Sequence, residues 1–158
     1  MESLIHKVLD KTDIAILDIL QRQADLSNIE IAKRVSLSSP AVHARIKRLE
    51  TEGYIQRQVA ILDPEKLGFD LLCFVFISTT IHQAEELTVL ESALEAMPEV
   101  LECQCLTGEY DYLLKVANKD RKELQAFIRK LNKLGITKIQ TSLALREIKS
   151  STVLPIHF

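Results

Sequence analysis

Residues 27–50 read SNIEIAKRVSLSSPAVHARIKRLE, a stretch in which two helical patterns are separated by a short polar interruption. Ser27 and Glu30 make a capping-box sequence, in which two side chains three residues apart bond to the free N–H groups at the start of a helix. Ser38 or Ser39 can cap the second helix in a similar way. The stretch therefore predicts a pair of helices joined by a tight turn.

The second of these helices has one apolar face and one face suited to DNA. Val42, Ile46 and Leu49 recur at helical spacing and form a narrow apolar stripe that packs inward. The opposite face, to which Lys47 and Arg48 are both assigned, has small residues in its first turns and basic residues toward its end. Small residues let a backbone approach base edges, while lysine and arginine reach phosphates. The residues predicted to contact DNA are Ser38, Ser39, Pro40, Ala41, His43, Ala44, Lys47 and Arg48, together with Arg34 and Arg57.

The charge distribution agrees with this assignment. Residues 33–58 hold six basic and two acidic residues, a balance of +4 in a chain whose net charge is −2. A basic island in an acidic protein is the electrostatic footprint of a nucleic-acid site. A solvated helix face would also be basic, but it would not call for the capping box or for the small Ala32 where the helices cross. Arg45 lies at the edge of the apolar stripe, where it either braces the fold or touches DNA.

The residues around this helix pair complete a first domain. Residues 9–20 repeat apolar side chains at helical spacing and add a third helix. Gly53, which can adopt a positive φ, is expected to end the last helix. Residues 54–62 look extended and are assigned to a strand or wing that leads out of the domain. The combination predicts a winged helix-turn-helix over residues 1–62.

The rest of the chain alternates between strand and helix patterns. After Asp63 and Pro64, which break the extended segment, the order is strand, helix, strand, strand, helix, strand. This is the ferredoxin-like βαββαβ arrangement. It predicts a second domain over residues 63–158, and the whole chain is assigned to the α+β class. The six patterns cover residues 71–80, 84–97, 100–107, 110–117, 120–134 and 136–149.

Composition excludes several classes of protein. The 158 residues are 47% hydrophobic and 27% charged, as in a soluble globular protein, and no apolar run approaches the ~20 residues of a membrane helix. The first residues do not resemble a signal peptide, so a cytoplasmic location is expected. Cys73, Cys103 and Cys105 are expected to be reduced thiols without the further ligands of a zinc site. A redox role or a place in a ligand pocket are the alternatives for these cysteines.

An enzyme is not expected. The sequence has no phosphate-cradling motif, no dinucleotide-binding glycine motif and no nucleophile elbow. Its four histidines are scattered over segments expected at the surface or at the termini. No cofactor, metal or membrane partner is expected either.

Two motif blocks, residues 27–50 and TGEYDYLL at residues 107–114, closely resemble the leucine-responsive regulator/AsnC family, also called feast/famine regulators. The likeness begins at Leu9 and extends to residues 154–156, nearly the whole chain. It implies dimers that often assemble further, commonly to octamers, through a second half that also senses a ligand. It implies control of transcription in response to amino acids or related metabolites. The chain departs from the family at Asp25, where a basic residue is common, and at Ser36, where the turn usually has glycine.

The best candidate for a chemical site lies between Thr107 and Asp111. Asp111 can accept the ammonium group of a free amino acid, and the turn at Gly108 lets a ligand approach backbone N–H groups closely. The alternative is a plain hairpin turn in which Asp111 caps nearby backbone. The resemblance places the pocket around this hairpin and the last strand, at an interface between protomers. The residues predicted to bind the effector are Cys105, Thr107, Gly108, Tyr110, Asp111, Thr141 and Ser142.

These observations predict a sequence-specific transcriptional regulator that binds double-stranded DNA and responds to a small effector, first of all an amino acid. A homodimer or a larger assembly such as an octamer is expected. The alternative is an architectural DNA-binding protein that assembles on DNA without a ligand. A ferredoxin-like subunit that regulates an enzyme is a weaker alternative, because it would leave the helix-turn-helix without a role.

Overall fold

The computed structural model describes residues 9–156, and the chain divides into two compact units. The first unit contains the residues up to Ile61 together with the segment that begins at Lys149. The second unit is Leu62–Ile148. The segment from Lys149 onward was predicted to belong to the second domain, so the two divisions of the chain differ at this segment. Among the described residues, no helix is long and apolar enough to cross a membrane.

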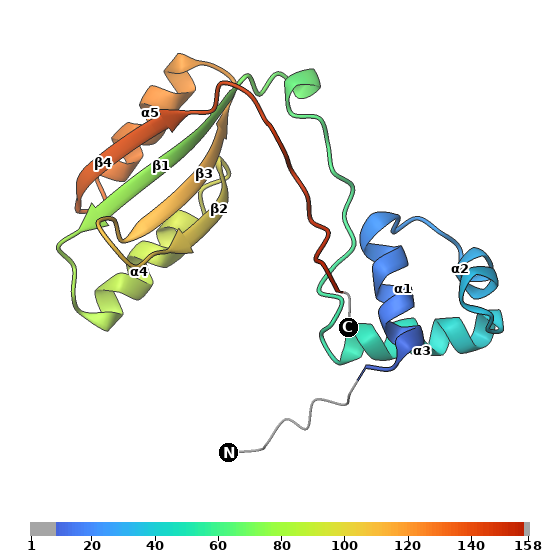
Figure 1. The fold of residues 1–158 in the computed structure, drawn as a ribbon. Helices are drawn as coiled ribbons and strands as arrows, with labels where there is room; N and C mark the ends of the chain where they lie inside the picture. Colours follow the sequence, from blue (N-terminus) through green and yellow to red (C-terminus); the bar gives the residue numbers. More distant parts are fainter. Residues whose placement is uncertain (1–8, 157–158) are drawn as a thin grey trace. The chain divides into compact units, whose positions relative to one another are not determined.

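The first unit contains three helices (Figure 1), and each of them begins at a side-chain cap. Asp10 accepts from the Asp13 N–H, Ser27 from the Glu30 N–H and Ser38 from the Ala41 N–H. The capping box predicted at Ser27 is confirmed, and Ser38 rather than Ser39 caps the helix that follows. A second capping box joins Asp10 and Asp13. The helices are α1 (Lys11–Arg22), α2 (Asn28–Val35) and α3 (Ser39–Thr51).

The turn between α2 and α3 depends on one left-handed residue. Ser36 has φ 55° and ψ 43°, and its N–H donates to the Ala32 carbonyl. Among the described residues it is the non-glycine residue with a positive φ. The small Ala32 of α2 is buried in the same core cluster as Val42 and Leu49 of α3. Gly53 follows α3 with φ 80°, as predicted.

The core of the first unit confirms the predicted apolar stripe. Val42 and Leu49 are fully buried, and Ile46 packs against them. Residues 54–62, all of which the structure describes, form no strand, so the strand alternative for this segment is wrong. Tyr54 and Ile55 pack on the helical core instead, which anchors the end of the domain. The buried residues of this core are Ile16, Leu20, Ile31, Ala32, Val42 and Leu49.

The second unit has the predicted order of elements. Its four strands form one sheet with the order β2-β3-β1-β4, and every neighbouring pair is antiparallel. A short 3-10 turn, Glu65–Leu67, precedes the sheet. The last strand ends at Leu143, earlier than predicted, and the chain then leaves the sheet. The elements are β1 (Leu71–Thr79), α4 (Ala84–Glu95), β2 (Val100–Cys105), β3 (Tyr112–Asn118), α5 (Arg121–Asn132) and β4 (Ile136–Leu143).

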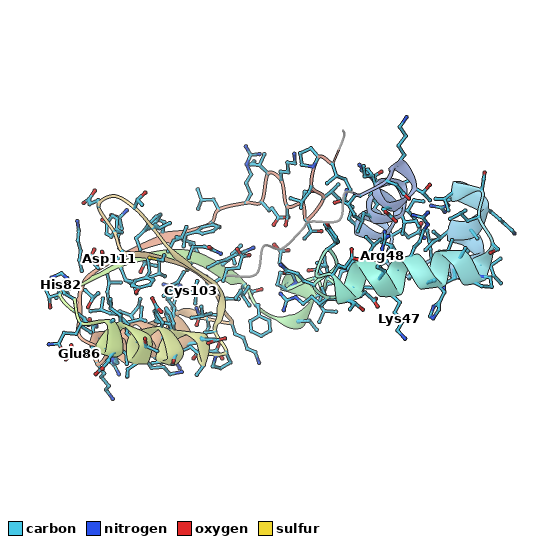
Figure 2. The ribbon with its side chains drawn as sticks, turned by 90° about the horizontal axis from the view of Figure 1, so that it is seen from below. Lys47, Arg48, His82, Glu86, Cys103 and Asp111 are labelled. Carbon is cyan, nitrogen blue, oxygen red and sulfur yellow. The ribbon has the colours of Figure 1, made fainter. Side chains whose placement is uncertain are left out.

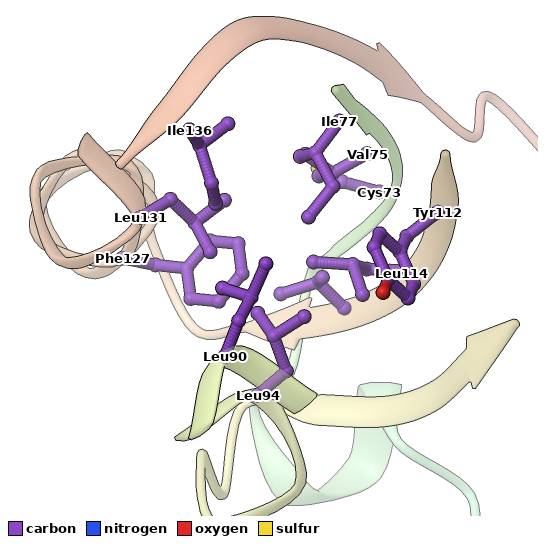
Figure 3. Close-up of a cluster of buried hydrophobic side chains, with 11 residues drawn as sticks. Cys73, Val75, Ile77, Leu90, Leu94, Tyr112, Leu114, Phe127, Leu131 and Ile136 are labelled. Atoms are coloured by element: carbon purple, nitrogen blue, oxygen red, sulfur yellow. The ribbon is translucent and has the colours of Figure 1, made fainter. Parts of the chain in front are cut away.

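Helices α4 and α5 cover one face of this sheet (Figure 1). Alternate residues of β1 and β3 point into the layer between sheet and helices, because side chains of a strand alternate between its faces. Figure 3 shows these side chains meeting the inward side chains of both helices. The buried cluster is Cys73, Val75, Ile77, Leu90, Leu94, Tyr112, Leu114, Val116, Phe127, Leu131 and Ile136. This packing fixes the hairpin between β2 and β3, which holds the predicted effector site.

Candidate DNA-binding and effector sites

Lys47 and Arg48, neighbours on α3, leave the helix on different sides (Figure 2). The Lys47 side chain projects into solvent, whereas Arg48 turns toward α1. The Arg48 guanidinium lies 2.6 Å from a carboxylate oxygen of Asp13. The outward direction predicted for Arg48 is therefore corrected. A helix advances 100° per residue, so a position beside the exposed face can also reach the neighbouring helix when its side chain is long.

Asp13 is the centre of a charged cluster between α1 and α3. It is only 1% exposed, and its carboxylate accepts from Arg45 at 2.6 Å and from Arg48 at 2.6 Å. Arg45 also bonds to Asp10 at 2.6 Å, and Glu52 lies 3.9 Å from Arg48. Of the two roles open to Arg45, the structure shows the bracing of the fold. A buried carboxylate needs such partners, because an unpaired buried charge is costly.

The hydrogen bonds of the cluster shift the pKa values of Asp10 and Arg45. The hydrogen bond from Arg45 holds the pKa of Asp10 below its ordinary value. The same bond, with that to Asp13, raises the pKa of Arg45. Both shifts favour the charged forms that pair with one another. The arginines are thus engaged by carboxylates on α1.

Sequence reasoning missed the role of Asp13, although a signal for it was present. By residue type and position alone, Asp10 and Asp13 are explained as carboxylates near the positive end of a helix dipole. Asp10 and Asp13 are three residues apart, and so are Arg45 and Arg48. Equal spacing of opposite charges on two helices is a pattern that favours pairing across them.

The other residues predicted to contact DNA gather on the first unit, mostly in exposed positions. Ser39 and Ala41 are half-buried within the first turn of α3. His43 lies beside the start of α2, with its Nδ1 3.3 Å from the Asn28 amide nitrogen. The exposed members are Ser38, Pro40, His43, Ala44 and Lys47, with Arg34 on α2 and Arg57 beyond α3.

Asp111 lies where the hairpin meets β1. Its Oδ2 accepts from the Thr79 N–H at 2.8 Å, so one carboxylate oxygen does cap nearby backbone. Its own N–H donates to Ile77 and its carbonyl accepts from Leu106. Oδ1 has no hydrogen-bond donor within the described part of the chain. Gly108 adopts φ 122°, as a tight turn there requires.

Tyr110 connects the hairpin to β4. Its hydroxyl donates to Gln140 at 2.5 Å, and its ring lies 5.4 Å from that of Phe76. Lys138 sits 4.5 Å above the Tyr110 ring and pairs with Glu109 at 2.5 Å. These contacts raise the pKa of Lys138. The hairpin is thereby anchored to an edge strand of the sheet.

The remaining residues predicted to bind the effector lie far apart within one chain. Cys105 is on β2 and Thr141 and Ser142 are on β4, the two opposite edges of the sheet. Three strand spacings of about 4.8 Å separate these edges, roughly 14 Å. Thr141 pairs with Val75 and Ser142 with Phe74, so the two side chains also point to opposite faces. One chain does not bring these three residues into one pocket.

The cysteines are free thiols. Cys73 is buried in the core, whereas Cys103 and Cys105 are exposed on β2. Desolvation raises the pKa of Cys73 and Cys103, which lowers the fraction of reactive thiolate. Among the described residues, no group of three or more His, Cys, Asp or Glu side chains could hold a metal ion.

Both units of the chain are similar to domains of known proteins. Residues 9–56 match the family profile for a winged helix-turn-helix DNA-binding domain, and residues 72–154 match that for the Lrp/AsnC ligand binding domain. The DNA-binding transcriptional activator DecR of Escherichia coli K12 is 39% identical over 95% of this chain and 100% of its own length. The leucine-responsive regulatory protein of Haemophilus influenzae is 35% identical over 98% of this chain and 94% of its own.

Solved structures of other proteins have a similar fold over most of the chain. The crystal structure of a transcriptional regulator from Neisseria meningitidis in complex with L-Met has a TM-score of 0.88 and 37% identity, over 94% of this chain and 97% of that one. An AsnC family transcriptional regulator from Agrobacterium tumefaciens also has a TM-score of 0.88, with 36% identity over 93% of this chain and 97% of that one.

Proposed function

Because the chain belongs to the Lrp/AsnC family of DNA-binding transcriptional regulators, we propose that it binds specific DNA sites through α3 and responds to an amino acid. Exposed Lys47, on the side of α3 away from the Asp13 cluster, is the observation that supports the DNA contact. Ser38, Pro40, His43 and Ala44 of the predicted contacts are also exposed on this unit. The recognition helices of two protomers would then enter successive major grooves of a palindromic site.

The DNA contact is tested by the salt dependence of affinity. Each neutralised phosphate contributes about 0.9 to the slope of log K against log salt. Lys47→Gln is expected to lower the magnitude of the slope by about 0.9, measured by titration of a labelled duplex from 50 to 200 mM salt. Lys122→Gln is the matched control, because it removes an exposed basic side chain from α5 of the second unit. An equal effect of both variants would contradict the contact.

The effector is proposed to bind beside Asp111. The oxygen Oδ1, left over after Oδ2 caps the Thr79 N–H, is a suitable acceptor for an ammonium group. The turn at Gly108 exposes backbone N–H groups that suit a carboxylate. The neighbour from Neisseria meningitidis was solved with L-Met, which makes amino acids the first class to test.

The pocket is proposed to form between protomers. Cys105 and the pair Thr141 and Ser142 lie on opposite edges of the sheet, so a pocket that holds all of them would combine two chains. A homodimer, or a larger assembly such as an octamer, supplies these edges. Binding at such an interface would favour one assembly state and alter how many recognition helices engage DNA together.

The melting temperature in the presence of each of the twenty amino acids tests the effector proposal. A ligand that binds only the native state at 100 times its Kd adds about 2.7 kcal/mol, or roughly 5–10 °C for a chain of this size. Asp111→Asn keeps an acceptor for Thr79 and removes the charge, so it is expected to abolish the shift. Glu109→Gln, in the same exposed turn, is the control and should retain it. No shift with any amino acid would favour the architectural alternative.

A further inference from the structure

Two of the basic side chains on the recognition helix are engaged by a buried carboxylate on another helix. Asp13 is 1% exposed and bonds to both Arg45 and Arg48. We propose that Asp13 is a specificity-determining residue, which holds these arginines away from DNA phosphates and so limits sequence-independent binding. The proposal rests on the binding of DNA by this family and adds a role for a residue outside the DNA-contacting face.

The distribution of charge supports this division of roles. Arg45 and Arg48 pair with Asp10, Asp13 and Glu52, so the cluster carries no net positive charge to attract phosphate. The other basic residues of the island form no ion pair among the described residues and are exposed. They are Lys33, Arg34, Lys47 and Arg57. The positive electrostatic field that attracts DNA therefore comes from these four residues, although residues 33–58 contain six basic residues.

The burial of Asp13 makes this arrangement hard to reverse. If Arg48 paired with a DNA phosphate instead, the buried carboxylate of Asp13 would lose one of its partners. Removing a partner from a buried charge is strongly unfavourable, whereas an exposed pair is easily exchanged. The arginines keep 30% of their side-chain surface exposed, so they lie close to the α3 surface without being free. If Arg45 and Arg48 were released from Asp13, both guanidinium groups would come within reach of DNA.

Sequence-independent binding measures this effect directly, because it comes almost entirely from phosphate contacts. The experiment titrates full-length protein with a random-sequence duplex between 50 and 200 mM salt. Asp13→Asn should steepen the salt slope by up to about 1.8, which corresponds to two further phosphates. Affinity would then fall about 12-fold more than in the wild type over this fourfold range of salt. Arg45→Gln and Arg48→Gln should each leave the slope unchanged.

A second variant separates this role from folding. Asp10 has half of its side chain exposed and, of the two arginines, pairs with Arg45 alone. Asparagine can still cap α1, so Asp10→Asn perturbs the core less and should steepen the slope by at most about 0.9. A lower melting temperature of Asp13→Asn with an unchanged slope would mean that the cluster is merely structural, and would overturn the proposal. A shallower slope in Arg45→Gln or Arg48→Gln would also overturn it.

The same assay distinguishes this proposal from that made for Lys47. If Lys47→Gln leaves the slope unchanged while Asp13→Asn steepens it, the contact at Lys47 is wrong and the role of Asp13 stands. If Lys47→Gln lowers the slope and Asp13→Asn leaves it unchanged, the DNA contact of Lys47 stands and the role proposed for Asp13 is wrong. A wild-type protein without any affinity for the duplex would overturn both.

Discussion

Ser36 occupies a conformation that favours glycine, at the turn on which the helix-turn-helix depends. A side chain in the left-handed region costs about 1–2 kcal/mol, because its Cβ approaches the following carbonyl. Ser36 is exposed, so its side chain adds little packing to compensate. Serine therefore keeps the geometry of this turn at the cost of local strain, which glycine would avoid.

Ser36→Gly is therefore expected to stabilise the protein by about 0.5–1 kcal/mol, since relief of strain exceeds the extra flexibility that glycine adds to the unfolded chain. Urea denaturation followed by circular dichroism measures the change. Ala44→Gly is the matched control, because it introduces glycine into right-handed helix and should destabilise by about 1 kcal/mol. Similar destabilisation by both substitutions would show that Ser36 is not strained.

The helices differ in how their first turns are capped. Ser27, Ser38 and Asp120 each accept a backbone N–H of their own helix, and so does Asp10. Gln83 precedes α4 as its N-cap residue and makes no side-chain cap, although its φ of −79° and ψ of 129° suit one. The first turn of α4 thus keeps N–H groups that only solvent can satisfy.

Gln83→Asp should supply this missing cap and stabilise the second unit by about 0.5–1 kcal/mol. The gain comes from a carboxylate that accepts the free N–H groups and lies near the positive end of the helix dipole. Thermal unfolding gives the measurement, with Gln83→Asn as a neutral cap and Gln83→Ala as the uncapped control. Equal melting temperatures of the Asp and Ala variants would contradict this prediction.

Acid should destabilise the caps. Hydrogen bonds and nearby basic groups lower the pKa of Asp10, Glu30 and Asp120 in the folded protein. A lowered folded-state pKa adds stability that is complete above the unfolded values of about 4. That stability is lost as the pH falls through the folded-state values, because the unfolded chain then binds protons more readily.

The melting temperature is accordingly expected to be steady from pH 7 to about pH 5 and to fall steeply below about pH 4. Asp120→Asn, which can still cap α5 but cannot ionise, should reduce the steepness of this fall. Asp25→Asn removes an exposed carboxylate outside the caps and should leave the profile as it is. A profile unaffected by Asp120→Asn would argue against the role of that cap.

At the scale of the whole molecule, the end of the chain returns to its beginning. Leu154 exchanges two hydrogen bonds with the Gln21 side chain, its N–H donating at 2.9 Å and its carbonyl accepting at 3.0 Å. The second unit is therefore inserted between two parts of the first, and two covalent segments connect the units. The segment that follows β4 is thus held to α1 by these two hydrogen bonds.

Gln21→Ala should release this last segment, because it removes both bonds at once. Each bond is worth about 1 kcal/mol net, so hydrogen exchange at the Leu154 amide should quicken about tenfold or more. Exchange detected by mass spectrometry of the C-terminal peptide gives the measurement. Gln23→Ala, at an exposed position one residue beyond α1, should have no such effect. Equally fast exchange in the wild type would mean that the bonds do not hold the segment.

Local features were predictable because they depend on neighbours in sequence. The capping box at Ser27, the buried stripe from Val42 to Leu49 and the βαββαβ order all follow from spacing that a short window contains. Residues 54–62 form no strand, because a strand needs a partner and Tyr54 and Ile55 instead pack against the helices. A pattern of alternation does not show whether that partner exists.

The sequence alone thus determined the kind of DNA-binding domain and the order of elements in the second unit. Tertiary structure decided the direction of Arg48, because the attraction of a buried carboxylate 35 residues away acts only once α1 and α3 pack. It also decided that Cys105 and Thr141 lie on opposite edges of the sheet, since strand order is a matter of non-local pairing. Which charges are free, and which residues can share a pocket, depends on distances that only the folded chain establishes.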